Sequence, residues 1–272
     1  MKRIRGPLIF LIILILICII NIYALSVELE VNYYNTKSNN LNNDIRICHI
    51  SDLHDYSFGD NQKDLIKAIN DSNSDLILLT GDIFDETKKN ENVFKLIDGI
   101  KSHPHIYYVT GNHEYRISNL YSLLNRLEEN NVKVLHNKTE ELVINGNKIT
   151  VSGMDDSISY QMGTWVKKLN GLSAKLDDNN YNILLSHRPN YSSYYKNTKF
   201  DLILSGHYHG GQFRIPFTNI GLISPDGLFP KYTGGFYDLG NNKLFVSRGL
   251  AKGWLPRYFN KPELCILNIK SE

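Results

Sequence analysis

A layered α/β fold is the architecture that this 272-residue sequence predicts. From residue 45 to residue 129, short apolar runs alternate with stretches of helical apolar periodicity, which is the pattern of strands that alternate with helices. A chain of this length with 42% hydrophobic residues buries a large core, and α/β folds of this size commonly form one domain. We therefore expect one such domain, preceded by an apolar N-terminal segment.

The predicted elements form strand–helix pairs at first and change to strands and loops later. Residues 27–34 alternate apolar and polar side chains, as a half-buried strand does, whereas residues 36–43 are rich in Asn and Ser and predict a loop. Asn145-Gly146 marks a hairpin turn. The further predicted strands are 45–51, 76–80, 106–110, 132–135, 142–144, 148–151, 182–186 and 202–205, and the predicted helices are 61–70, 92–101, 118–129 and 164–174.

The C-terminal segment 213–269 is rich in aromatic residues, Gly and Pro, and it predicts strands and long loops. Its first part carries large apolar side chains for which two interpretations exist. We favour the core of a second sheet over a lipid-binding groove or a contact with a bilayer. The side chains are those of Phe213, Ile215, Phe217, Ile220, Leu222, Ile223, Leu228 and Phe229.

The N-terminal segment predicts a membrane anchor. Residues 7–25 form an almost unbroken apolar run, near the lower limit of about 17 to 25 residues for a bilayer span. A cleaved signal peptide has a similar pattern, but Ile22-Tyr23-Ala24 matches the small-residue cleavage pattern poorly, so we favour an uncleaved single-pass anchor. The basic tip of residues 1–6 would then stay in the cytosol, and the domain of residues 26–272 would lie on the extracytoplasmic side of the cell membrane.

Charge and cysteine content exclude two classes of protein. The formal net charge is +2, and no basic block follows the N-terminus, so the sequence has no footprint for nucleic acid. Cys18, Cys48 and Cys265 form neither a disulfide framework nor a zinc ribbon. We expect Cys48 and Cys265 in the core, with a buried bridge between them as the alternative. The sequence predicts no particular oligomeric state.

Potential metal ligands follow five of the predicted strands. Because ligands of open α/β sheets bind beyond the carboxyl ends of the strands, we expect these five loops to converge. Side chains two residues apart in extended chain leave the same face, so His207 and His209 point into one cavity. The candidates are Asp52 and His54, Asp82 and Asp85, Asn112 and His113, His187, and His207 and His209.

This mixture of carboxylate, amide and imidazole suits Mn, Fe or Zn. The ligands are too many for one ion, whereas two ions about 3.5 to 4 Å apart that share a carboxylate would use them all and stabilise an in-line phosphoryl displacement. The sequence therefore predicts phosphoester hydrolysis. Taken singly, each residue has a structural alternative, such as a helix cap for Asp52 or Asp82 and a turn for Asn112.

The order and spacing of these motifs resembles the calcineurin-like metallophosphoesterase family, from about residue 45 to the C-terminus. The closing Gly210-Gly211-Gln212 is similar to the membrane-associated branch that includes UDP-2,3-diacylglucosamine hydrolases. The motifs are Asp52-x-His54, Gly81-Asp82-x-x-Asp85, Gly111-Asn112-His113-Glu114, His187 and Gly206-His207-x-His209.

This resemblance implies two facing mixed β-sheets flanked by helices, and it implies a role for each site residue. Water activated by two paired cations would be the nucleophile, His113 would protonate the leaving oxygen, and Asp85 would orient His113. Asp52, His54 and His209 would hold one ion, Asn112, His187 and His207 the other, and Asp82 would bridge both.

The sequence departs from the phosphoprotein phosphatases of this family, which carry an arginine at the position of Glu86. A phosphomonoester needs such a cation for its extra charge, so we favour a phosphodiester or pyrophosphate, on an envelope lipid or sugar-nucleotide lipid. Arg188 is a possible substitute, which keeps a phosphomonoesterase or a general phosphodiesterase open. A non-catalytic tethered metal-binding module is the alternative from another class.

Four further charged residues have unassigned roles. Arg248 and Arg257 either hold substrate phosphate or pair with surface acids, and we favour the second interpretation. Asp155 and Asp156 follow a Gly-Met turn, and we expect solvated loop acids there in preference to residues that approach the site.

Overall fold

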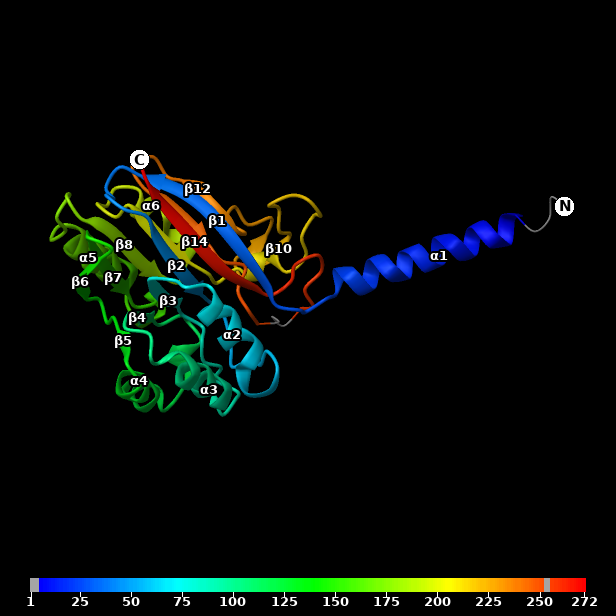
Figure 1. Ribbon diagram of the computed structural model, residues 1–272, viewed down its shortest axis with the longest axis horizontal. Helices are drawn as coiled ribbons and strands as arrows, with labels where there is room; N and C mark the ends of the chain where they lie inside the picture. The colour runs from blue at the N-terminus through cyan, green and yellow to red at the C-terminus, as the bar shows by residue number, and fades with distance from the viewer. Residues whose placement is uncertain (1–4, 252–254) are drawn as a thin grey trace.

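Two six-stranded sheets face each other, and helices cover their outer faces, in the computed structural model of this protein (Figure 1). The structure describes residues 5–251 and 255–272, so Lys2 and Arg3 of the predicted basic tip lie outside the described residues. The expected α/β architecture of two facing mixed sheets is confirmed. The parallel strands of both sheets end toward the same edge of the molecule, and this edge carries the candidate ligands.

The first sheet has the strand order β1-β14-β2-β3-β4-β5. Strands β2 to β5 are parallel, and β14 pairs antiparallel with β2 and parallel with β1. Helices α2 (Lys63–Asp71), α3 (Glu91–Ile100) and α4 (Leu120–Glu129) cover its outer face. The strands are β1 (Glu30–Ser38), β2 (Ile45–Ile50), β3 (Leu76–Thr80), β4 (Ile106–Val109), β5 (Val132–Val134) and β14 (Glu263–Ser271).

The second sheet has the order β12-β13-β9-β8-β7-β6, with α5 (Met162–Ser173) and the short α6 (Ser192–Tyr195) outside it. The predicted hairpin joins β6 and β7, with φ of 51° at Asn145 and 79° at Gly146, the left-handed values of a type I′ turn. The strands are β6 (Thr139–Ile144), β7 (Asn147–Met154), β8 (Tyr181–Ser186), β9 (Leu202–Ser205), β12 (Gly235–Asp238) and β13 (Lys243–Val246), and a separate hairpin comprises β10 (Ile223–Ser224) and β11 (Gly227–Leu228).

Strand β1 differs from the expected element. The strand was expected over residues 27–34 and a loop over 36–43, but β1 runs from Glu30 to Ser38. The reason is tertiary, since every residue of β1 pairs in parallel with a residue of β14. A strand at the C-terminus of the chain therefore decides the length of the first one, and local polarity does not.

Three apolar layers form the core, one between the sheets and one on each outer face. Cys48 and Cys265 are both fully buried and free, as expected. Cys48 belongs to the layer beneath the helices of the first sheet and Cys265 to the layer between the sheets. Because the two thiols lie on opposite faces of one sheet, the alternative of a buried bridge is excluded.

Helix α1 (Arg5–Ala24) projects away from the sandwich as a single rod (Figure 1). Its stretch Gly6–Ala24 is long and apolar enough to cross a membrane, a property that a signal sequence shares. The end of the helix is tied to the domain, because the Phe259 N–H donates to the Ala24 carbonyl over 2.8 Å and the Tyr258 hydroxyl donates to Asn21 Oδ1 over 3.1 Å.

The favoured interpretation of the apolar side chains between residues 213 and 229 was wrong. None of the eight is buried, and Phe217 is fully exposed. The chain leaves the second sheet after β9 and rejoins it only at β12, so this segment forms long loops and the small hairpin β10–β11.

The closeness of the two sheets makes one glycine sensitive to substitution. A Cβ added at Gly153 would lie 2.3 Å from Leu135 Cβ and 2.5 Å from Val109 Cγ1. We expect Gly153→Ala to lower the free energy of unfolding by about 1 to 3 kcal/mol through overpacking. Gly171→Ala in α5 is the control, because its Cβ would meet nothing within 4 Å, and we expect it to stabilise by about 0.5 to 1 kcal/mol. Urea unfolding in detergent measures both, and equal effects would contradict this packing.

Candidate metal centre

The loops after β2, β3, β4, β8 and β9 meet at one edge of the sandwich, and hydrogen bonds of backbone and side chains connect them. Within the first sheet, the Asp52 N–H donates to the Gly81 carbonyl over 3.1 Å. Between the sheets, His187 Nδ1 lies 2.7 Å from the Thr80 carbonyl oxygen. The His207 N–H lies 3.0 Å from each carboxylate oxygen of Asp52. The predicted convergence therefore occurs, and it joins loops of both sheets.

The backbone at this edge is strained. Five of the seven predicted ligands have φ in the left-handed region, which non-glycine residues rarely adopt. Such outliers persist only where surrounding contacts hold them, and they gather at functional sites. The φ values are 52° at Asp52, 45° at His54, 50° at Asp82, 71° at His207 and 47° at His209.

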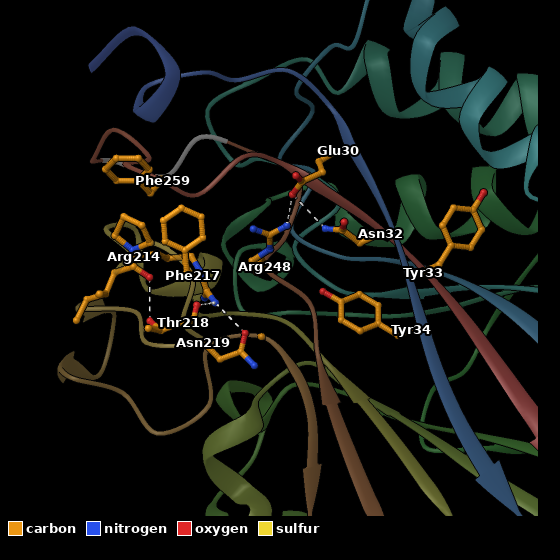
Figure 2. Close-up of a pocket in the computed structure, with 13 residues that line it drawn as sticks. Glu30, Asn32, Tyr33, Tyr34, Arg214, Phe217, Thr218, Asn219, Arg248 and Phe259 are labelled. Atoms are coloured by element: carbon orange, nitrogen blue, oxygen red, sulfur yellow. Dashed lines mark hydrogen bonds and ion pairs between the residues drawn. The ribbon is translucent and has the colours of Figure 1, made fainter. Parts of the chain in front are cut away.

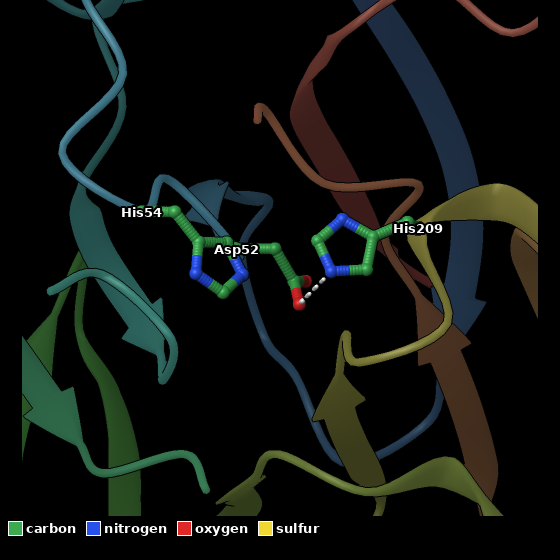
Figure 3. Close-up of side chains that lie close together, drawn as sticks. All are labelled: Asp52, His54 and His209. Carbon is green, nitrogen blue, oxygen red and sulfur yellow. Dashed lines mark ion pairs between the residues drawn. The ribbon is translucent and has the colours of Figure 1, made fainter. Parts of the chain in front are cut away.

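A first group of ligand-type side chains comprises Asp52, His54 and His209 (Figure 3). Their donor atoms all lie within 4.8 Å of one another, and His209 Nε2 is 3.6 Å from Asp52 Oδ1. Gly206 makes room for this carboxylate, because an added Cβ would lie 2.2 Å from Asp52 Oδ2. The glycine before the two histidines is therefore a steric requirement of the group.

A second group comprises Asp82, His187 and His207. His187 Nε2 is 3.1 Å from Asp82 Oδ2 and 3.2 Å from His207 Nδ1. Asp82 Oδ1 accepts the His113 N–H over 2.9 Å, while Oδ2 also lies 3.8 Å from His54 Nε2 of the first group. Asp82 therefore stands between the two groups, at the position expected of a shared ligand.

The electrostatics of the groups suit metal binding. Burial lowers the pKa of His54, His207 and His209, so these imidazoles are neutral and offer lone pairs. Burial also disfavours the charged form of His187, but the carboxylates of Asp82 and Asp52 outweigh it and raise its pKa to about 10. A proton on His187 thus balances buried negative charge, which is what a divalent cation between these side chains would do.

Buried polar atoms without partners also fit a cation. Among the described residues, the buried polar atoms without a hydrogen-bond partner include Asn112 Oδ1 and His54 Nε2. Buried polar groups are normally satisfied, so such atoms at one site indicate a missing ligand. Imidazole, carboxylate and amide donors together match Mn, Fe or Zn. The residues present therefore fit a divalent metal centre.

Comparison with known proteins identifies the family. Residues 45–211 match the sequence model of the calcineurin-like phosphoesterases. The chain belongs to this family. It is a metallophosphoesterase, a hydrolase of a family that uses divalent metals.

Two relatives in sequence are metallophosphoesterases described as uncharacterized. Cj0846 of Campylobacter jejuni is 32% identical over 89% of this chain, which spans 64% of that relative's length. YkuE of Bacillus subtilis is 30% identical over 83% of this chain and 79% of its own length. The solved structure of TT1561 of Thermus thermophilus shares the fold, with a TM-score of 0.52 and 13% identity over 77% of this chain and 91% of that one.

The carboxylate beside His113 of this metallophosphoesterase is not the one that was expected. His113 Nδ1 lies 2.6 Å from Glu86 Oε2, and Glu86 is held in turn by Arg116 Nη1 at 3.2 Å. Asp85 Oδ1 instead accepts the backbone N–H and hydroxyl of Thr87. Glu86, and not Asp85 as expected, is therefore the carboxylate that lies at Nδ1 of His113.

Glu114 supports the loops without belonging to either ligand group. Its buried carboxylate accepts the backbone N–H groups of Gly111, Asp82, Ile83 and Phe84. Burial, and then the nearby charge of Asp82, raise the pKa of Glu114 to about 7. Glu114 therefore has a structural role, because it joins the loop after β3 to the loop after β4.

The expectation for Asp155 and Asp156 was wrong, since both are buried. Asp155 accepts hydrogen bonds from Thr110, Asn137 and Tyr160. Asp156 Oδ2 accepts the Nε–H of Arg188 over 2.8 Å, and this pair places Arg188 Nη1 3.2 Å from His207 Nε2. The turn residues before the two acids gave no sign of burial, which comes from contacts with residues distant in the sequence.

Arg248 pairs with Glu30, whose side chain is 40% exposed, and with the fully buried Glu263. Arg257 pairs with no acid among the described residues, so for Arg257 the favoured interpretation was wrong. Arg257 is 1% exposed and donates to the carbonyls of Ala251, Arg248 and Gly249. Burial lowers the pKa of Arg257 to about 9. It holds residues 248–251 against Asp52, whose carbonyl accepts the Ala251 N–H over 2.7 Å.

Replacement of Arg257 tests this supporting role. Arg257→Met leaves three carbonyls without a charged donor, so we expect a loss of about 3 kcal/mol of unfolding free energy and a reduced metal content. Arg126→Met is the control, because Arg126 is exposed with its guanidinium over the face of Phe94, and we expect a change below about 1 kcal/mol. Urea unfolding and elemental analysis measure both variants. Equal stability of the two would refute the role of Arg257.

Proposed function

We propose that this metallophosphoesterase hydrolyses a phosphodiester or pyrophosphate bond with two divalent ions, while anchored by α1 with its domain on the extracytoplasmic side. The observation that carries the proposal is the position of Asp82 between two groups of ligands. The anchored arrangement follows from the apolar stretch Gly6–Ala24 and the basic residues before it. In this interpretation residues 1–6 remain in the cytosol and residues 26–272 form the enzyme.

The proposed ligand sets follow the two groups. Bound divalent ions supply Lewis-acid stabilisation of phosphoryl oxygens and lower the pKa of water, so that a nucleophile exists at neutral pH. Mn, Fe and Zn suit the donors equally. We assign Asp52, His54 and His209 to one ion, Asn112, His187 and His207 to the other, and Asp82 to both.

His113 is the proposed general acid. Its Nε2 lies 3.9 Å from Asp82 Oδ2 and so faces the centre, while Nδ1 is bound to Glu86. Although burial raises the pKa of Glu86, its hydrogen bonds with His113 and Arg116 and the charge of His113 together outweigh burial and lower it, so Glu86 is ionised. An ionised carboxylate at Nδ1 holds one proton of an imidazolium there, and the second proton, on Nε2, is the one that would pass to the leaving oxygen.

Charge near the acid favours substrates with one negative charge at phosphorus. Glu86 places a carboxylate where phosphatases of the family carry an arginine, and this carboxylate repels a doubly charged monoester. Arg188, the possible substitute, is already paired with Asp156. We therefore favour diesters and pyrophosphates, and the membrane helix favours an envelope lipid or sugar-nucleotide lipid.

Two other functions are the alternatives to this proposal. A phosphomonoesterase would use Arg188 to neutralise the extra charge, and a substrate panel of phosphomonoesters, cyclic nucleotides, glycerophospholipids and UDP-linked glycolipids separates it from our proposal. A non-catalytic tethered metal-binding module has no use for an imidazole oriented by a carboxylate, so the His113–Glu86 pair argues against it.

Activity of the full chain in detergent tests the proposed chemistry. We expect bis(p-nitrophenyl) phosphate to be hydrolysed, the activity to disappear on chelation, and manganese to restore it. Asp82→Ala and His113→Ala remove the shared ligand and the acid, so we expect losses of at least about 100-fold. Asp98→Ala, which changes an exposed acid on α3, is the control that should keep full activity. Full activity in Asp82→Ala would end the proposal.

A second comparison separates Glu86 from Asp85. Because Glu86 orients the acid, we expect Glu86→Ala to lower kcat by about 10- to 100-fold with little change in KM or metal content. Glu86→Gln keeps an acceptor for Nδ1 and should recover part of the loss. Asp85→Ala should stay within a few-fold of the parent chain. The reverse ranking of the two alanine variants would restore the original assignment of Asp85.

A further inference from the structure

An exposed group of apolar side chains lies in the loops between β9 and β12. We call it the apolar rim, and it comprises Ile215, Phe217, Ile220, Leu228 and Phe229. Phe217 is 107% exposed, Leu228 72% and Phe229 70%. The other large exposed apolar residues outside the α1 region are scattered over separate elements of the described chain. A gathered apolar surface of this kind indicates a contact with a partner or a membrane.

The backbone is strained at two phenylalanines of the apolar rim. Phe217 has φ of 63° and Phe229 has φ of 53°, in the left-handed region that bulky residues rarely enter. Such strain persists where the surrounding structure imposes it, and it motivates a functional hypothesis. The fold therefore tolerates strain at the two positions that present phenylalanine side chains to the outside of the domain.

The apolar rim lies beside the point where α1 leaves the domain. A cavity of about 340 Å³ there is lined by Tyr23 of α1 together with Phe217, Phe259 and Lys261. Figure 1 shows the loops around β10 on the side of the domain from which α1 projects. Figure 2 shows Phe217 and Phe259 near each other, and both line an adjoining cavity of about 350 Å³ together with Arg248 and Glu30.

The direction of α1 relative to the domain is fixed by several contacts. Besides the hydrogen bonds of Tyr258 and Phe259 to the helix end, the rings of Tyr23 and Phe259 lie 6.3 Å apart. Lys261 Nζ lies 5.3 Å from the centre of the Tyr23 ring. If α1 spans a bilayer, its end at Ala24 and the surface beside it lie at the bilayer interface. Aromatic rings and lysines are enriched at that depth.

We propose that the apolar rim inserts into the phospholipid leaflet through which α1 emerges. The domain then contacts the bilayer at two places, α1 and the loops that carry Phe217 and Phe229, and the mouth of the cavity beside Tyr23 lies at the level of the lipid headgroups. This inference rests on the anchoring of α1 that forms part of the proposed function. Continuity with α1 selects the bilayer as the occupant in preference to a second copy of the chain or another protein.

Spin labels in the full chain test the insertion. The protein is reconstituted in nanodiscs of phosphatidylethanolamine and phosphatidylglycerol, and collisions of each label with oxygen, which enters the bilayer, are compared with those of a water-soluble nickel chelate. Single cysteines replace Phe217, Phe229, Tyr121 or Val143 in a Cys18→Ala background, where Cys48 and Cys265 are buried and unreactive. Tyr121 and Val143 are exposed on α4 and β6 and serve as matched controls.

We expect the ratio of oxygen to nickel collisions to be several-fold higher at Phe217→Cys and Phe229→Cys than at the two controls. A label on the natural Cys18 reports separately whether α1 lies in the bilayer. A high ratio at Cys18 with control values at residues 217 and 229 would overturn the insertion alone. Restricted motion of the labels at residues 217 and 229, with low collision rates for both probes, would also overturn it, because it indicates contact with a protein partner or a second copy. A water-like ratio at Cys18 would overturn the insertion together with the proposed anchor.

Discussion

Two buried carboxylates near His187, those of Asp52 and Asp82, are the constraint on which the site of this metallophosphoesterase depends. They are 0% and 1% exposed, and a buried ion costs several kcal/mol unless nearby groups compensate it. Part of the compensation is fixed backbone, since the N–H groups of His207 and His113 point at them. The remaining compensation requires positive charge, either a proton on His187 or a metal ion. The desolvation that makes these carboxylates costly to bury therefore favours cation binding.

The surrounding residues serve this arrangement in different ways. Gly206 leaves space for Asp52, Glu114 joins the loops after β3 and β4 through four backbone amides, and Arg257 holds residues 248–251 against Asp52. None of these side chains belongs to a ligand group. These residues hold the five loops of the metal centre in one arrangement. The ligand side chains are therefore preorganised before any ligand binds.

The sequence predicted what depends on local pattern. Strand β3 was placed with its observed bounds, and most other strands and helices within a few residues, because apolar runs and helical periodicity are local properties. The convergence of the strand-end residues also followed, since parallel strands end at one edge of a sheet. From the sequence, we assigned Asp85 to the position beside His113 that Glu86 occupies. The hydrogen bonds of Asp85 with Thr87 form in a local turn, and residue spacing does not predict that turn.

Other errors came from tertiary context. The C-terminal half of β1 forms because β14 pairs with it from the far end of the chain, and Asp156 is buried because Arg188 approaches it from another loop. The apolar side chains near β10 were assigned to a core because hydrophobicity alone does not distinguish a buried face from one that meets lipid. Their position beside α1 is visible only once the chain is folded.

Anomalous X-ray scattering from crystals of the manganese-loaded protein tests the dinuclear centre most directly. The account predicts two peaks about 3.5 to 4 Å apart, one beside Asp52, His54 and His209 and one beside Asn112, His187 and His207, with the Asp82 carboxylate in contact with both. A single peak, or peaks that do not contact Asp82, would contradict it.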